Sequence, residues 1–134
     1  MHLLLVGMLA LSVSLFTSCG EEEVDPEAPK LNWTNYDGSD KSVLVGEAVS
    51  FEFEIEKVTN DIKSVEVYYT VGSGDDFYLC NTADSSSAPK DGDKIKVSKT
   101  FTGVGVYPFV FVVTDKEDLK FTDTVNVTVE AAFN

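Results

Sequence analysis

Acidic side chains in the loops are the residues of this chain best suited to hold a metal ion. Five of them fall in two stretches that we predict to be loops, residues 83–93 and 115–118: Asp91, Asp93, Asp115, Glu117 and Asp118. Carboxylate oxygens are the ligands that Ca²⁺ prefers, so these acids are a candidate calcium site if the two loops meet at one end of the fold. Their spacing matches no defined calcium-loop motif, and the nearby Lys90, Lys94 and Lys116 favour ion pairs as the alternative.

Aromatic side chains are the second group with a chemical use, because a flat ring can stack on the apolar face of a sugar. The candidates for such contacts are Trp33, Tyr36, Tyr68 and Tyr78. Alternation along the strand places Tyr68 outward, opposite inward Tyr69, and Tyr78 falls on the next predicted strand, so Tyr68 and Tyr78 form a predicted shallow platform. The alternative is that Trp33 covers the end of the fold and that the tyrosines are ordinary strand formers.

Catalytic groups are scarce in this sequence. The only histidine is His2, no arginine is present, and no Ser, His and Asp set or Cys and His pair can be assembled. The acids alternate along strands or lie in turns, which is typical of a solvated surface and not of the paired carboxylates of a glycosidase. The sequence therefore predicts a protein that is not an enzyme and that needs no cofactor apart from the calcium considered above.

An uncharged apolar segment covers residues 3–16 and ends shortly before Cys19. It has the length of a signal-peptide core and is shorter than the roughly 20 residues that span a bilayer. The motif Leu15-Phe16-Thr17-Ser18-Cys19 resembles the lipobox of bacterial lipoproteins. That resemblance implies removal of residues 1–18 as a lipoprotein signal peptide and attachment of a diacylglycerol to the sulfur of Cys19. An ordinary secretory signal and an uncleaved anchor are the alternatives.

The residues after Cys19 are acidic and contain two prolines, Pro26 and Pro29. Like charges repel and proline stiffens the chain, so residues 19–29 are predicted to form an extended, lipidated tether. The run Gly20-Glu21-Glu22-Glu23 also resembles the signal that follows the lipidated cysteine in surface lipoproteins of Bacteroidetes. The resemblance implies an outer-membrane protein, anchored to the lipid bilayer through Cys19 and exposed at the cell surface.

The charge balance limits the partners. The chain has 10 basic residues against 23 acidic ones, for a net charge of -13, and such a surface repels nucleic acid. Residues 30–134 are enough for one domain with one core. If Cys19 carries lipid, Cys80 has no partner for a disulfide, and we predict that it fills space in a strand as a small hydrophobic residue.

Alternation of apolar and polar residues with a period of two dominates residues 30–134. Val49, Phe51, Phe53 and Ile55, for example, alternate with Ser50, Glu52, Glu54 and Glu56. Lys99 interrupts the corresponding inward series of its own strand. Strands are predicted near residues 30–33, 42–45, 49–55, 65–71, 77–81, 95–101, 107–113 and 124–130. About seven or eight short strands separated by turn residues indicate an all-β, antiparallel sandwich.

The run Gly105-Val106-Tyr107-Pro108-Phe109-Val110-Phe111-Val112-Val113-Thr114-Asp115 resembles the penultimate strand of bacterial Ig-like domains, including the PKD-like type. The resemblance implies an antiparallel Ig-like β-sandwich of about seven strands, in which Tyr107 is a corner tyrosine whose hydroxyl bonds to the backbone of the preceding turn. It also implies that Phe109 replaces the second cysteine of an antibody domain and packs against Phe51 or Phe53. Pro108 departs from the pattern, because proline cannot donate to the ladder of a central strand.

Location and fold together predict a surface lipoprotein with a non-catalytic binding module. Its partner is expected to be a glycan or an outer-membrane protein. The alternative is a structural or adhesive Ig-like spacer within an outer-membrane assembly.

Overall fold

The computed structural model describes residues 25–72, 74–82 and 88–132. Every regular element in these residues is a strand, which confirms the prediction of an all-β fold. The eight strands are β1 (Lys30–Trp33), β2 (Lys41–Leu44), β3 (Ala48–Glu56), β4 (Ile62–Thr70), β5 (Asp76–Asn81), β6 (Lys94–Thr100), β7 (Gly105–Asp115) and β8 (Lys120–Glu130). Within the described ranges, no helix has the length and apolar character needed to span a membrane.

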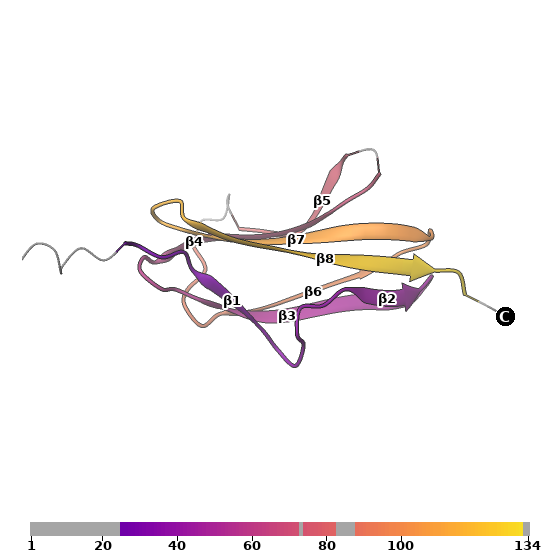
Figure 1. The fold of residues 1–134 in the computed structure, drawn as a ribbon, viewed down its shortest axis with the longest axis horizontal. Coiled ribbons are helices and arrows are strands. Elements are labelled where there is room, and N and C mark those ends of the chain that lie inside the picture. The colour runs from indigo at the N-terminus through magenta and orange to yellow at the C-terminus, as the bar shows by residue number, and fades with distance from the viewer. Residues whose placement is uncertain (1–24, 73, 83–87, 133–134) are drawn as a thin grey trace, which may run out of the picture.

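The strands form two sheets that pack face to face (Figure 1). One sheet has the order β1-β3-β6 and the other the order β2-β8-β7-β4-β5. The predicted sandwich is confirmed, with one correction to its antiparallel character. The chain crosses from β1 in the first sheet to β2 at the edge of the second, where β2 pairs in parallel with β8 and Lys41 lies opposite Val127.

The core lies between the sheets and is built from the predicted inward rows. Phe51 and Phe53 of β3 face Phe109 and Phe111 of β7, and all four side chains are at most 2% exposed. The ring centroids of Phe51 and Phe109 lie 5.2 Å apart, and those of Phe53 and Phe111 lie 5.8 Å apart. These contacts join the two sheets where an antibody domain has its disulfide, and Cys80 is a free cysteine. The aromatic packing inferred from the sequence is therefore confirmed.

Tyr107 is the corner tyrosine that the sequence predicted. Its hydroxyl donates a hydrogen bond of 2.9 Å to the carbonyl oxygen of Gly103 in the preceding loop. Its ring stacks on Phe101, with centroids 4.0 Å apart and planes 16° from parallel. The side chain thus fixes the β6–β7 loop to the end of the core.

Pro108 fits β7 because the two neighbours of this strand do not pair with it over the same length. The ladder with β8 runs from Gly105, and Pro108 lies opposite Asn126. The ladder with β4 begins only at Phe109, which lies opposite Tyr69. The proline therefore lies outside the part of β7 that has neighbours on both sides.

The sandwich has two ends that differ in their relation to the N-terminus (Figure 1). The N-terminal segment joins at the end that carries the β3–β4 loop, residues 88–93 and the β7–β8 turn, which we call the tether pole. There the backbone N–H of Glu27 donates to the Thr59 hydroxyl at 2.9 Å. The opposite end, the distal pole, carries the β4–β5 turn, the β6–β7 loop and the β2–β3 turn. The poles are about 35 Å apart along the 11-residue β7, at about 3.3 Å per residue.

Candidate functional site

The β4–β5 hairpin places Tyr68 and Tyr78 side by side. The two residues lie opposite each other in the register of the hairpin, and their ring centroids are 5.0 Å apart with planes at 44°. The register shifts between Val67 and Tyr68: Val67 lies opposite Cys80, so Leu79 is the extra residue of a bulge on β5. The bulge allows Tyr78 to share the outer face with Tyr68 while Cys80 lies opposite an inward valine.

The tyrosine pair is one end of a row that crosses the outer face of the five-stranded sheet. Tyr68 lies opposite Val110 of β7, and Val110 lies opposite Thr124 of β8. We call the row of Tyr78, Tyr68, Val110 and Thr124 the outer platform. Tyr78 is 49% exposed and Tyr68 is partly exposed, so the platform presents two accessible rings beside a short aliphatic and a hydroxyl side chain.

The electrostatic environment of the platform favours the neutral phenol of Tyr68. Partial burial, followed by the negative charges of Asp76, Tyr78 and Glu66, raises the pKa of Tyr68 above its usual value. A neutral phenol keeps both its O–H donor and its acceptor lone pairs. The platform therefore combines apolar ring faces with hydroxyl groups at their edges, which is the combination that a sugar ring can use.

Trp33 and Tyr36, the other two predicted ring contacts, lie elsewhere. The ring of Trp33 packs edge-on against Phe111 at 4.8 Å and against Tyr36 at 5.0 Å between centroids. Lys41 holds its ammonium 4.4 Å from the centroid of the Tyr36 ring, and the Tyr36 hydroxyl donates to the carbonyl oxygen of Ser39. These two side chains pack on the side of the core and do not extend the platform. Trp33 is a core-covering residue, but it lies at the side of the sandwich and not at its end, as the alternative interpretation expected.

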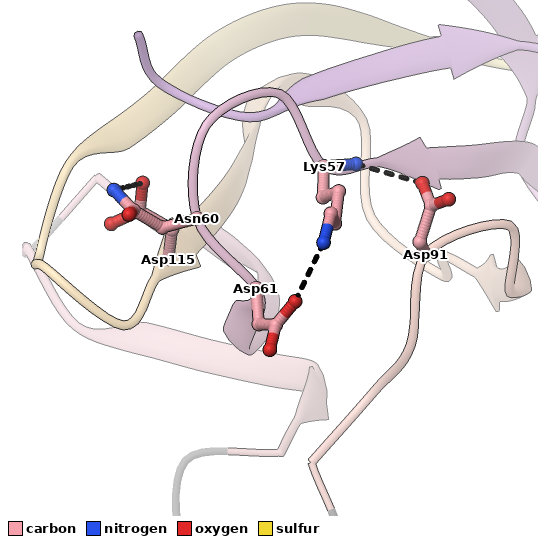
Figure 2. A network of polar contacts seen from close by, with 5 residues as sticks. All are labelled: Lys57, Asn60, Asp61, Asp91 and Asp115. Atoms are coloured by element: carbon pink, nitrogen blue, oxygen red, sulfur yellow. Dashed lines mark hydrogen bonds and ion pairs between the residues drawn. The ribbon is translucent and has the colours of Figure 1, made fainter. Parts of the chain in front are cut away.

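Three of the carboxylates considered for calcium accept hydrogen bonds from backbone N–H groups. Asp115 is fully buried, and its Oδ1 accepts from the N–H groups of Glu117 and Leu119, each at 2.9 Å. Its Oδ2 accepts from the Asn60 amide at 3.2 Å (Figure 2). Asp91 accepts from the Lys57 N–H at 2.8 Å, as Figure 2 also shows, and Asp93 accepts from the Lys90 N–H at 2.8 Å.

These bonds explain the chemistry of Asp115. Burial by itself raises the pKa of the carboxyl, but hydrogen bonds from Leu119, Asn60 and Glu117 favour the charged form and hold the pKa below its usual value. Asp118 forms an ion pair with Lys63 at 2.8 Å, and this lysine is not one of the three that the alternative named. Within residues 25–72, 74–82 and 88–132, no three acidic, histidine or cysteine side chains gather in a group that could hold a metal.

A cavity of about 550 Å³ lies at the tether pole, where Lys57, Lys90 and Lys116 line it together with Asp61 and Asp91. Lys57 forms an ion pair with Asp61 at 2.9 Å, shown in Figure 2. Three lysines and two aspartates of the described chain line the cavity, so most of its charge is compensated within the lining.

Cys80 is half-buried and packs against the core. Burial raises the pKa of its thiol above the usual value, so the nucleophilic thiolate is disfavoured. The predicted space-filling role fits this environment. Cys19, the predicted lipidation site, lies outside the described residues.

A second aromatic group escaped the sequence interpretation. Tyr69, Phe77, Lys99, Phe101 and Tyr107 line a cleft of about 260 Å³ at the distal pole, which we call the distal cleft. Its signal in the sequence was Lys99, the one charged residue in an otherwise inward apolar series. A lysine in such a position indicates an edge of the core that is open to solvent.

Comparison with known proteins places the chain by its fold. No protein-family model and no curated protein matches the sequence. Among solved structures, the PKD domain of an M14-like peptidase from Thermoplasmatales archaeon SCGC AB-540-F20 matches with a TM-score of 0.50 and 16% identity, over 78% of this chain and 95% of that domain. Murine CRIg matches with a TM-score of 0.40 and 10% identity, over 78% of this chain and 98% of that chain. The likeness to the PKD domain shows a β-sandwich fold of the PKD type.

Proposed function

We propose that the chain is a lipid-anchored, non-catalytic module of the cell surface that binds glycans on its outer platform. The observation that carries the proposal is the pairing of Tyr68 and Tyr78, with ring centroids 5.0 Å apart on the outer face of the sheet. Folded proteins usually bury large rings or scatter exposed ones singly. Two adjacent rings held at a fixed angle by a hairpin offer a preformed stacking surface, so little conformational entropy is lost on binding.

The placement of the platform is consistent with an anchor at Cys19. The described chain joins the sandwich at the tether pole, where Glu27 bonds to Thr59. An extended segment from Cys19 to Pro29 reaches up to about 35 Å, at about 3.3–3.6 Å per residue. In a domain held in this way the distal pole points away from the membrane, and the outer platform lies on the side of the domain, between the two poles.

The fold supports binding rather than chemistry. The matched PKD domain is one part of a peptidase and is named separately from the enzyme that contains it. In this chain Asp115 accepts hydrogen bonds within its own turn, Asp91 accepts one from the backbone of Lys57, and Asp118 forms an ion pair. A recognition surface on rigid strands needs no reactive group.

A glycan-array screen followed by calorimetric titration tests the proposal. We expect Tyr68→Ala and Tyr78→Ala each to weaken binding of the glycan selected by the parent at least about tenfold. The guide for this size is the stacking of a nucleic-acid base on an aromatic side chain, which contributes about 1–3 kcal/mol. Tyr68→Phe and Tyr78→Phe keep the ring faces and should retain most of the affinity. Thr122→Ala changes an exposed residue on the same sheet and is the positional control. Equal affinity of the parent and the double alanine variant would refute the assignment.

A spacer or adhesive role is the second candidate, and exposed valines at the distal pole favour it. Val104 and Val106 are 61% and 60% exposed, and apolar side chains grouped at one end of a domain are typical of a protein contact. Detergent extraction of the outer membrane followed by affinity purification tests it. A stoichiometric partner that the variant Val104→Ser, Val106→Ser releases would support this role, and recovery of the domain alone would oppose it.

A further inference from the structure

The distal cleft lies between the β4–β5 hairpin and β6, on the opposite face of the hairpin from the outer platform. The hairpin contributes Tyr69 and Phe77, whose rings stack with centroids 5.4 Å apart and planes at 24°. Phe77 is 45% exposed, so one ring of this stack lies at the mouth of the cleft. The hairpin therefore presents rings on both of its faces, two outward and two toward the cleft.

The floor of the cleft is held in place by contacts that do not depend on a ligand. Tyr69 packs edge-on against Phe101 at 5.1 Å, and Phe101 stacks on Tyr107 at 4.0 Å. The hydroxyl of Tyr107 is bonded to the Gly103 carbonyl. Rings fixed in this way form a preorganised surface, which lowers the entropic cost of binding.

Lys99 gives the cleft its charge. Its ammonium lies 5.7 Å from the ring centroid of Tyr69 and 5.9 Å from that of Phe101, within the range of a cation–π contact. The other described residues that line the cleft are apolar, aromatic, threonine or glycine, with no carboxylate among them. Lys99 is the only charged side chain among the described residues that line the cleft, so an anionic group can pair with its ammonium there without a competing carboxylate in the lining.

We propose that the distal cleft binds a uronic acid residue of a glycan, with its carboxylate on Lys99 and the apolar face of its ring on the exposed ring of Phe77, which Tyr69 supports from below. This inference rests on the proposed glycan-binding function and adds a ligand class and a second site to it. The cleft volume of about 260 Å³ lies just below the range of about 300–1,000 Å³ for drug-sized ligands. It therefore suits one ring of a chain. The hydroxyls of Thr100 and Thr102, which also line the cleft, can bond to the sugar hydroxyls.

Calorimetric titration with oligogalacturonate and with the uncharged galactose oligomer of equal length tests the proposal. We expect the parent to bind the acidic oligomer and to lose affinity as salt concentration rises. Lys99→Gln should weaken binding about tenfold, the size of one charge-assisted hydrogen bond. Lys94→Gln is the matched control, because it removes the same charge from an exposed position of the same strand. Phe77→Ala should weaken binding, whereas Phe77→Tyr should retain it.

Three outcomes would overturn the uronic acid assignment. One is that the parent does not bind oligogalacturonate, and the second is that Lys99→Gln and Lys94→Gln lose equal affinity. The third is that the cleft binds a peptide that ends in a free carboxylate but not the acidic sugar oligomer. Thermal melts of each variant show whether it is folded. The test is separate from that of the outer platform. Tyr78→Ala should leave Lys99-dependent binding of a short acidic oligomer intact, and Lys99→Gln should leave binding of neutral glycans to the platform intact.

Discussion

Truncation of Phe111 tests the register of the whole sandwich. The side chain is fully buried, and its ring centroid lies 4.8 Å from that of Trp33, 5.0 Å from that of Phe51 and 5.8 Å from that of Phe53. Replacement of a buried phenylalanine by alanine costs about 3–5 kcal/mol, because apolar burial is lost and a cavity remains. Each aromatic pair contributes about 0.5–1.5 kcal/mol beyond its buried area. Three such pairs place Phe111→Ala toward the upper end of that range.

Urea denaturation gives the free energy of unfolding, and thermal melts give the melting temperature. Both are followed by the fluorescence of Trp33, the single tryptophan, and in parallel by circular dichroism. For a domain of this size, 1 kcal/mol corresponds to a shift of about 4 °C or more in melting temperature. Phe111→Ala should therefore melt at least about 12 °C below the parent. Val110→Ala is the matched control, because the neighbouring side chain faces outward and is partly exposed. A loss below about 1 kcal/mol in Phe111→Ala, or an equal loss in Val110→Ala, would show that the inward row has been assigned incorrectly.

Other predictions concern charge and the anchor. The lowered pKa of Asp115 contributes stability above the unfolded value of about 3.9 that is lost as the pH falls through the folded value. Asp115→Asn should therefore make the free energy of unfolding depend less steeply on pH in acid, and Asp76→Asn is the exposed control. Added Ca²⁺ should not raise the melting temperature of the parent. Burial raises the pKa of Tyr36 to about 12, so stability should fall between about pH 10 and 12. Melts across that range should show a smaller fall in Tyr36→Phe, because the raised pKa of Tyr68 contributes with the same sign. Mass spectrometry of the membrane fraction should find acyl chains on the parent and on Cys80→Ser, but not on Cys19→Ser.

The sequence was sufficient to predict the inward rows, because a half-buried strand repeats with a period of two and needs no knowledge of its partner. Phe51, Phe53 and Phe109 were assigned to the core on this basis and are buried. The bond from Tyr107 to the carbonyl oxygen of Gly103 was implied by the resemblance to Ig-like domains and not by the alternation of residues. Alternation thus recovered the strands and their faces, and the resemblance added one corner.

The partners of strands and charges could not be read from the sequence. The parallel pairing of β2 with β8 joins residues more than eighty positions apart, and no local pattern marks it. Asp115 illustrates the same limit at the site. A carboxylate in a tight turn can bind a cation or accept hydrogen bonds from the turn, and its residue type is the same in both cases. The N–H groups of Glu117 and Leu119 decide in favour of hydrogen bonds, because their directions depend on the folded backbone.

The bulge at Leu79 connects the predicted platform with the unpredicted cleft. Strict alternation along β5 would place Cys80 on the same face as Tyr78, but the extra residue returns Cys80 to a position opposite inward Val67. A bulge also bends its strand and increases the local twist, and Figure 1 shows β5 rising away from the layer of β7 and β8. A strand that bends away from the opposing sheet leaves the end of the core uncovered between Phe77 and Lys99. One inserted residue can thus account both for the outward pairing of Tyr68 with Tyr78 and for the opening of the distal cleft on the other face of the hairpin.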